Sequence, residues 1–229
     1  MIRVENISMR LRAGGHPVMI LQELSFEIPD KQVVAIVGPS GSGKSTLLGL
    51  LAGLDQPTTG RISLQGQEIT ALTEYQLAQF RRQHIGYIFQ SFHLVPTLTA
   101  LENVSLPLEL GGEKAAMERA HELLDAVGLK ERAGHYPVQL SGGEQQRVAV
   151  ARAFVCQPPV LLADEPTGNL DSATGEMVIH LLLKLNRDHG STLVLVTHDF
   201  TLAQRADRII TLRDGRIASD EIQDKDSGA

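Results

Sequence analysis

Apolar residues come in short runs along most of the chain, and the period of each run predicts a secondary structure. Val33–Val37 is continuously apolar, which is typical of a strand buried on both faces. Residues 20–28 alternate in part, as in an antiparallel strand with one solvated face. Further strands are predicted at 2–7, 61–64, 160–163 and 193–196, with a hairpin of 209–212 and 216–218 about Asp214 and Gly215.

Helical periodicity dominates the stretch from about 73 to 140 and recurs in the last third. Two helices are marked by apolar residues three and four apart: Met117, Ala120, Leu124 and Val127, with Gly128 just after the helix end, and Val178, Leu181, Leu182 and Leu185. Strands that alternate with helices predict an α/β fold with a parallel sheet, an antiparallel β flank and a helical insertion. We expect a single domain over 1–229, with a helical subdomain at about 73–157 and a frayed tail at about 221–229.

Composition narrows the function classes. The 229 residues carry 21 basic and 27 acidic side chains, and this net charge of −6 argues against nucleic acid as a partner. A single cysteine, Cys156, excludes an intrachain disulfide and a CxxC zinc site. The first residues hold no apolar signal region, and no apolar run approaches the ~20 residues that span a bilayer. We therefore expect a soluble, cytoplasmic protein.

A glycine-rich motif lies between the buried strand Val33–Val37 and an apolar helical run at 46–54. It matches G-x-x-x-x-G-K-[ST] and continues into the helix: Gly38, Pro39, Ser40, Gly41, Ser42, Gly43, Lys44, Ser45 and Thr46. Glycines allow backbone N–H groups to converge on phosphates, while Lys44 is predicted to reach the β- and γ-phosphates and Ser45 to ligate Mg²⁺. A flexible Gly/Ser turn is the alternative, but the flanking strand and helix favour a nucleotide-binding P-loop NTPase core.

A second apolar strand, at 160–163, ends in two carboxylates, Asp164 and Glu165. In a P-loop protein an aspartate at this place helps to hold Mg²⁺. The glutamate after it can orient or deprotonate the attacking water, which predicts a hydrolase. Alone, the pair would be better explained as the charged end of a strand; beside a phosphate loop, catalysis is favoured.

The run LSGGEQQR, from Leu140 to Arg147, begins 24 residues before Asp164. Ser141, Gly142 and Gly143 open a predicted helix, so their N–H groups form a second anion site. Together with the phosphate loop, this run resembles the signature of the ATP-binding-cassette (ABC) ATPases. The resemblance implies that this site belongs to the opposite subunit of a homodimer and clamps the γ-phosphate of ATP bound by the first subunit.

The other family motifs follow residue by residue from the same resemblance, which covers the chain to about Ala218. Gln90 matches the glutamine that contacts Mg²⁺ and the attacking water. Asp171, in the run Asn169-Leu170-Asp171, matches the loop that crosses the dimer interface. His198 lies 34 residues after Asp164 and matches the histidine that contacts the γ-phosphate.

Two octapeptides, DEPTGNLD at 164–171 and FQSFHLVP at 89–96, resemble the lipoprotein-release, macrolide-export and cell-division subfamily. Within it, the nearest type is a bacterial cassette paired with a large separate permease. The resemblance implies ATP and Mg²⁺ as ligands and a place on the cytoplasmic face of the inner membrane. Clustered apolar residues in a loop-like stretch predict the permease contact, unless they pack into the helical insertion: Phe92, Leu94, Val95 and Leu98.

Two alternatives and one departure remain. The cassette could signal across the membrane to a periplasmic enzyme without transport, or serve as a soluble non-transport ATPase. Those soluble relatives tend to carry paired cassettes, coiled-coil insertions or basic arms, which this chain lacks. Where the family usually has an aromatic residue that stacks on adenine, this chain has Leu11, so stacking on a ring is in doubt.

Overall fold

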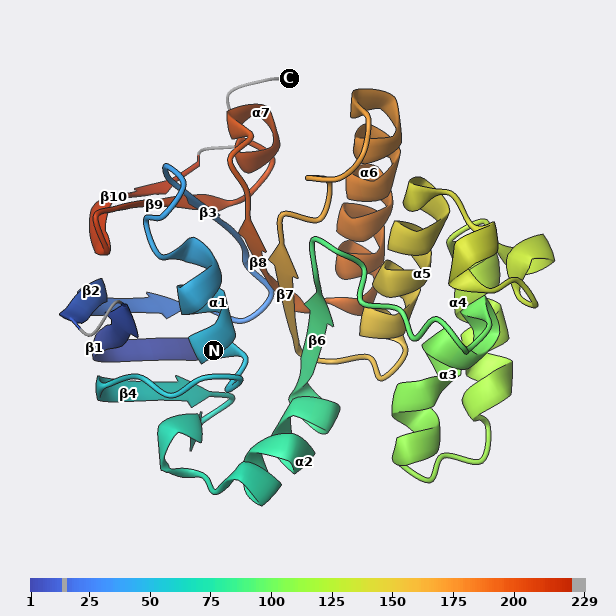
Figure 1. Cartoon of the computed structure of the whole chain (residues 1–229), viewed down its shortest axis with the longest axis horizontal. Helices are drawn as coiled ribbons and strands as arrows, with labels where there is room; N and C mark the ends of the chain where they lie inside the picture. Colours follow the sequence, from blue (N-terminus) through green and yellow to red (C-terminus); the bar gives the residue numbers. More distant parts are fainter. Residues whose placement is uncertain (14–15, 224–229) are drawn as a thin grey trace. The chain divides into compact units, whose positions relative to one another are not determined.

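The computed structural model describes residues 1–13 and 16–223, which fall into two compact units (Figure 1). The first unit joins the start of the chain, Met1–Arg81, to its last part, from Thr192 onward. The second unit is the continuous middle segment Arg82–Ser191. Each is described by itself below.

An antiparallel sheet in the first unit has the strand order β2-β1-β4-β5. Its strands are β1 (Ile2–Ala13), β2 (His16–Ile28), β4 (Thr59–Leu64) and β5 (Gln67–Glu68). Leu24, Phe26 and Ile28 of β2 are buried while the residues between them are exposed, as the alternating pattern predicts. Both long strands run further than expected, because β-bulges shift the alternation: Asn6 and Glu23 have left-handed φ values of 50° and 52°.

A parallel arrangement in the same unit carries the buried strand β3 (Val33–Val37) between β8 (Thr192–Val196) and β9 (Arg208–Arg213). The hairpin partner of β9 is β10 (Arg216–Ile222), and both turn residues, Asp214 and Gly215, have positive φ, as the predicted two-residue turn requires. The unit also holds α1 (Lys44–Leu51), the short α7 (Phe200–Ala203) and the 3₁₀ turn η1 (Ile69–Ala71). Helix α2 (Glu74–His84) leads into the second unit.

The second unit pairs β6 (Ile85–Ile88) in parallel with β7 (Val160–Asp164). Its helices are α3 (Ala100–Leu110), α4 (Ala116–Ala126), α5 (Gly142–Phe154) and α6 (Ser172–His189), with 3₁₀ turns η2 (Lys130–Arg132) and η3 (Pro137–Gln139). Helix α5 contacts α3, α4, α6 and β6, and its residues Val148 to Ala151 are buried. This helix is therefore the centre of the unit.

The predicted α/β class with a parallel sheet, antiparallel flank and helical segment is confirmed. Two details differ from the sequence-based expectation. Strand β6 lies in the stretch expected to be mostly helical. It was not predicted, because it follows α2 with no intervening helix-breaking residue. The predicted tail begins too early, since Glu221 and Ile222 belong to β10; residues 224–229 lie outside the described part.

Within the described residues, no helix is long and apolar enough to cross a membrane.

Candidate functional site

The phosphate loop connects β3 to α1, and its glycines are favoured by positive φ values or by close packing. Gly41 and Gly43 have φ values of 78° and 96°, in the region that favours glycine. A Cβ on Gly43 would lie 2.5 Å from Cδ2 of Leu21, and one on Gly38 would overlap the carbonyl oxygen of Leu212. The loop can therefore place its backbone N–H groups, rather than side chains, toward a ligand.

Lys44 is the first residue of α1 and is 7 % exposed. Its ammonium donates to the carbonyl oxygens of Gly38 and Pro39, each at 2.9 Å, so the loop itself holds the charge beside its own backbone. No side chain caps this helix N-terminus, and its first turn holds no acidic residue. These features suit an anion, because a helix N-terminus without a side-chain cap and a buried cation lie at the same loop.

Ser42 supplies a further sign of a missing ligand group. Its hydroxyl is buried, and it has no hydrogen-bond partner among the described residues. A buried hydroxyl without a partner costs free energy, so a phosphate oxygen in the loop would stabilise it. The loop thus fits a polyphosphate chain.

Leu11 lies on the strand pair next to the loop. It is paired with Val18 across β1 and β2, and the two side chains are 46 % and 42 % exposed. Alternation along β1 puts Leu11 on the same face as Met9, whose partner Leu21 contacts the loop at Gly43. Leu11 and Val18 therefore form an exposed aliphatic surface on that face.

His198 follows β8 in the same unit. The N–H of the preceding Thr197 donates to the carbonyl of Ile36 at 3.2 Å, which ties the end of β8 to the end of β3. Because parallel neighbours end at one edge of a sheet, the exposed His198 lies at the edge where the phosphate loop begins.

Asp164, Glu165 and Gln90 come together in the second unit. Ile88 pairs with Ala163, so the residues that follow β6 and β7 leave the sheet at the same edge. A Cβ placed on Gly168 would lie 2.7 Å from Nε2 of Gln90 and 3.3 Å from Oε2 of Glu165. The predicted amide and carboxylate therefore both border one residue, Gly168.

Neighbouring groups fix this arrangement. The amide of Asn169 donates to the carbonyl oxygen of Gln90 at 2.9 Å, and Glu165 opens a turn closed by the N–H of Gly168 on its carbonyl, also at 2.9 Å. Burial, and after it the negative charge of Asp164, raises the pKa of Tyr87 above its ordinary value of 10.0. The tyrosine next to Asp164 thus stays a neutral phenol.

The signature run forms the start of α5 and one wall of a pocket of about 420 Å³. Ser141 is the N-cap residue, and Gly142 and Gly143 are the first helical residues. Gly143 packs so closely on Thr174 of α6 that a Cβ there would overlap its methyl group. The opposite wall comes from the segment before α6 and its first turns: Asn169, Leu170, Asp171, Thr174 and Met177.

Asp171 is the N-cap residue of α6, in addition to its predicted role at the dimer interface. Its carboxylate accepts the N–H of Thr174 at 3.0 Å and caps α6. Hydrogen bonds from the side chain of Thr174 and, after it, from its backbone N–H hold the pKa of Asp171 below its usual value. The signature residues and Asp171 are thus brought to one pocket.

The apolar residues predicted to contact a permease lie in a loop whose backbone is hydrogen-bonded by two helical side chains. Arg152 of α5 donates to the carbonyl oxygens of Phe92 and His93 at 2.8 and 2.6 Å. The fully buried Asn103 bonds both backbone groups of Val95. The side chains of Phe92, Leu94, Val95 and Leu98 are half-buried.

Two residues that border the predicted site residues were not themselves predicted from the sequence. Gly168 has no special φ value, so nothing in the sequence shows that Gln90 and Glu165 border it. Glu144 completes a capping box with Ser141, and the S-x-x-E spacing was a signal that could have identified it.

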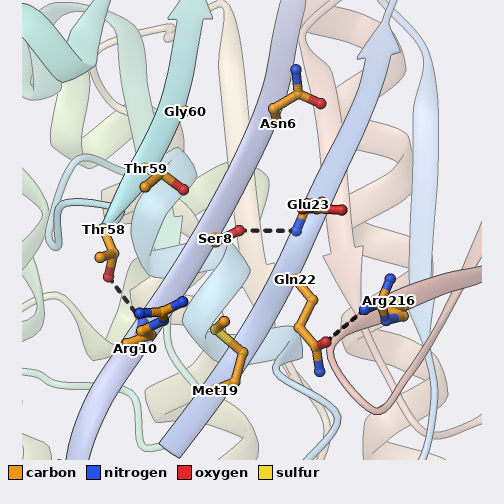
Figure 2. Close-up of a pocket in the computed structure, with 10 residues that line it drawn as sticks. All are labelled: Asn6, Ser8, Arg10, Met19, Gln22, Glu23, Thr58, Thr59, Gly60 and Arg216. Carbon is orange, nitrogen blue, oxygen red and sulfur yellow. Dashed lines mark hydrogen bonds between the residues drawn. The ribbon is translucent and has the colours of Figure 1, made fainter. Parts of the chain in front are cut away.

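A further pocket of about 770 Å³ lies on the solvated face of the antiparallel sheet (Figure 2). It forms around the bulges of β1 and β2, where the hydroxyl of Ser8 accepts the N–H of Glu23 at 3.0 Å. Arg216 borders it on one side and donates to Gln22 at 2.8 Å. None of the residues predicted to bind nucleotide lines this pocket.

Known proteins with similar sequences show the family of this chain. The family model for ABC transporters matches residues 21–168. The ABC transporter ATP-binding protein YbbA of Escherichia coli K12 is 50 % identical over 218 residues, covering 94 % of this chain and 96 % of that protein. The macrolide export ATP-binding/permease protein MacB of Rhodopirellula baltica is 46 % identical over 96 % of this chain, which spans 33 % of MacB.

Solved structures are similar along nearly the whole chain. A dimeric post-hydrolysis structure of the cassette MJ0796 with ADP and Pi has a TM-score of 0.90 and 43 % identity, covering 98 % of this chain and 99 % of that one. A second dimeric structure of MJ0796, described as a bacterial ABC transporter cassette, is 44 % identical with the same TM-score of 0.90. YbbA and MacB are consistent with the subfamily predicted from the motifs. The chain therefore belongs to the ABC transporter family and is an ATP-binding, ATP-hydrolysing cassette.

Proposed function

We propose that two copies of this chain close around two ATP molecules and that hydrolysis drives conformational change in a separate membrane permease. The observation that carries the proposal is the presence of two different anion-binding helix starts. Helix α1 offers Lys44 and an N-terminus that no side chain caps, while α5 offers Ser141 and two glycines beside a pocket. The dimeric state of the similar MJ0796 cassette supports the use of both starts across a subunit interface.

The phosphate-binding residues have separate roles in this proposal. Lys44 exchanges its two carbonyl partners for the β- and γ-phosphates, and Ser42 gains a partner for its buried hydroxyl. Ser45, Asp164 and Gln90 offer hydroxyl, carboxylate and amide oxygens, which are the hard donors that suit Mg²⁺. When bound, Mg²⁺ would neutralise charge on the β- and γ-phosphates.

Hydrolysis is assigned to Glu165 with help from Gln90 and His198. A water oxygen attacks the γ-phosphorus, the bond to the bridging oxygen of ADP breaks, and the water proton passes to Glu165. The amide of Gln90 borders the same residue as Glu165, which supports its assignment to orienting the water. His198 stands at the edge of the phosphate loop and is assigned the contact with the γ-phosphate.

The permease contact is assigned to the loop that follows Gln90. Arg152 and Asn103 bond the backbone of this loop, so its side chains are free to contact a partner. The partly exposed apolar residues Phe92, Leu94, Val95 and Leu98 form this contact. A cassette held to a permease in this way lies on the cytoplasmic face of the inner membrane.

Subunit mixing tests whether each ATP site uses both chains. Ser141→Arg blocks the signature pocket, and Lys44→Ala removes the cation of the phosphate loop. A heterodimer of the two variants has one site with both defects and one intact composite site. We expect each variant alone to be inactive and the mixture to regain part of the ATPase rate.

Two controls make the result specific. A mixture of Ser141→Arg with Ser141→Arg/Lys44→Ala has no intact site and should remain inactive. If the first mixture also stays inactive although native mass spectrometry detects its heterodimers, the shared site is contradicted.

A further inference from the structure

Glu144 places a carboxylate inside the pocket that is proposed to receive the γ-phosphate. Its Oε2 accepts the N–H of Ser141 at 2.8 Å and the hydroxyl of Ser141 at 2.9 Å. The N–H of Glu144 in turn donates to the Ser141 hydroxyl oxygen at 3.3 Å. This capping box completes the start of α5, but it leaves a negative charge beside a site for an anion.

The Ser141 hydroxyl has one proton to donate, and Glu144 holds it. To donate to a phosphate oxygen, the hydroxyl must leave the carboxylate. Glu144 then keeps the N–H of Ser141 and needs another donor to offset the lost hydrogen bond and the approaching phosphate charge. The pocket is thus favourable for phosphate only if Glu144 is neutralised by a cation.

Arg132 is positioned to supply that cation. Its Nε donates to Oε1 of Glu144 at 3.2 Å, on the oxygen that the Ser141 hydroxyl does not use. The Glu144 side chain is 20 % exposed and the Arg132 side chain is 50 % exposed, so the carboxylate side of this ion pair is the part shielded from water. Arg132 ends the turn η2, and its NH1 lies 3.4 Å from Nε2 of His135, which steadies the guanidinium.

The electrostatics of Glu144 agree with this role. Hydrogen bonds from Ser141, and to a smaller extent the bond and charge of Arg132, hold the pKa of Glu144 below its usual value. The group is therefore a carboxylate at neutral pH, and its charge is present whenever ATP binds.

We propose that Arg132 is a positioning residue for ATP-driven dimerisation: it neutralises and holds Glu144, so that the Ser141 hydroxyl can turn to the γ-phosphate bound by the partner copy. The inference rests on the proposed function, because Ser141 meets that phosphate only in the dimer. It predicts that Arg132 matters only while residue 144 is charged.

The test measures the ATP concentration for half-maximal dimer formation by analytical ultracentrifugation, in a Glu165→Gln parent that is expected to hydrolyse ATP slowly. Arg132→Ala should raise this concentration at least tenfold. Glu144→Gln keeps the shape of the side chain but removes its charge. When Glu144→Gln is added to Arg132→Ala, the half-maximal ATP concentration should lie within about twofold to threefold of that of the Glu144→Gln/Glu165→Gln protein, which retains Arg132. ATP affinity of the monomer should be the same in all variants, because Arg132 acts on the nucleotide of the other copy.

Lys130→Ala is the matched control. It removes the same charge two residues away, from a cation whose pairing with Asp125 is solvent-exposed, and should change dimerisation less than twofold. An unchanged Arg132→Ala variant, or a failure of Glu144→Gln to rescue it, would overturn the inference while the ATP-dependent dimer of the parent still supports the proposed function. A parent that does not dimerise with ATP would overturn both.

Discussion

Two buried polar side chains in the phosphate loop differ in how they are satisfied. The ammonium of Lys44 has two carbonyl partners, whereas the hydroxyl of Ser42 has none among the described residues. An unsatisfied buried hydroxyl costs about 1–3 kcal/mol, a cost that a bound phosphate oxygen would recover. A bound phosphate would therefore stabilise the loop at Ser42, while Lys44 already bonds the loop's own backbone.

Leu11 gives the residue-scale prediction. Leu11 and Val18 can cover a base with aliphatic area but offer no ring, so the ~0.5–1.5 kcal/mol that aromatic pairs gain beyond burial is absent. Leu11→Tyr should therefore tighten ATP binding by up to about tenfold and leave the hydrolysis step nearly unchanged. For the same reason, the wild type should discriminate poorly between ATP and GTP in equilibrium titrations under non-hydrolysing conditions.

Arg10 supplies the control for this substitution. It is the neighbour of Leu11 on β1 but lies on the other face of the sheet, in the pocket of Figure 2. Arg10→Tyr adds a ring of the same size and should leave ATP affinity within twofold of wild type. Equal affinities of wild type and Leu11→Tyr would show that Leu11 does not face the base.

Among the elements, those set by local chemistry could be predicted from the sequence. Continuous burial identifies β3, and the turn chemistry of Asp214 and Gly215 identifies the β9–β10 hairpin. Strand β6 could not be predicted, because a run of four residues directly after a helix is too short to show the periodicity of a strand. The far end of β1 was missed because the bulge at Asn6 interrupts its alternation.

The candidate site divides in the same way. Motifs with fixed spacing gave the phosphate loop, the acidic strand end and the signature run. The contact between Gln90, Glu165 and Gly168 joins residues about 75 positions apart and depends on the parallel pairing of β6 with β7. No local pattern encodes that pairing, so only the folded chain reveals it.

At the element scale, α3 begins with the same capping box as α5, formed by Thr99 and Glu102. Hydrogen bonds from Thr99 hold the pKa of Glu102 below its usual value. A carboxylate with a lowered folded pKa stabilises the fold above its unfolded pKa of about 4.3 and loses this effect as the pH falls through the folded pKa. Glu102→Gln should therefore lower the Tm at pH 7, and the difference should shrink below about pH 4.

Glu118 is the control for this pH series. It lies in the first turn of α4, where the N-cap residue Ala115 makes no side-chain hydrogen bond. Glu118→Gln should shift the Tm less at pH 7 than Glu102→Gln does. Thermal melts of the three proteins at several pH values decide the point, and a Glu102→Gln difference that grows on acidification would refute it.

For the whole molecule, charge sets a condition on assembly. Each copy carries a net charge of −6, and each ATP adds further negative charge, so long-range electrostatics oppose dimer formation. The attraction must come from short-range contacts at the phosphate loop and the signature pocket, both of which are proposed to contact the nucleotide. The dimer should therefore depend on bound ATP and dissociate once the γ-phosphate is lost.

Glu165→Gln tests this whole-molecule expectation. The amide keeps the shape of the side chain beside Gly168 but cannot take a proton from water, so ATP should bind while hydrolysis slows by about 100-fold or more. Because the γ-phosphate then persists, size-exclusion chromatography should show a dimer with ATP and a monomer with ADP. Glu176→Gln, a carboxylate change on α6 outside the site, should hydrolyse ATP like wild type and show no lasting dimer. Normal turnover of Glu165→Gln would contradict the role of Glu165 as the base. A dimer that forms equally well without nucleotide would contradict the dependence of assembly on the γ-phosphate.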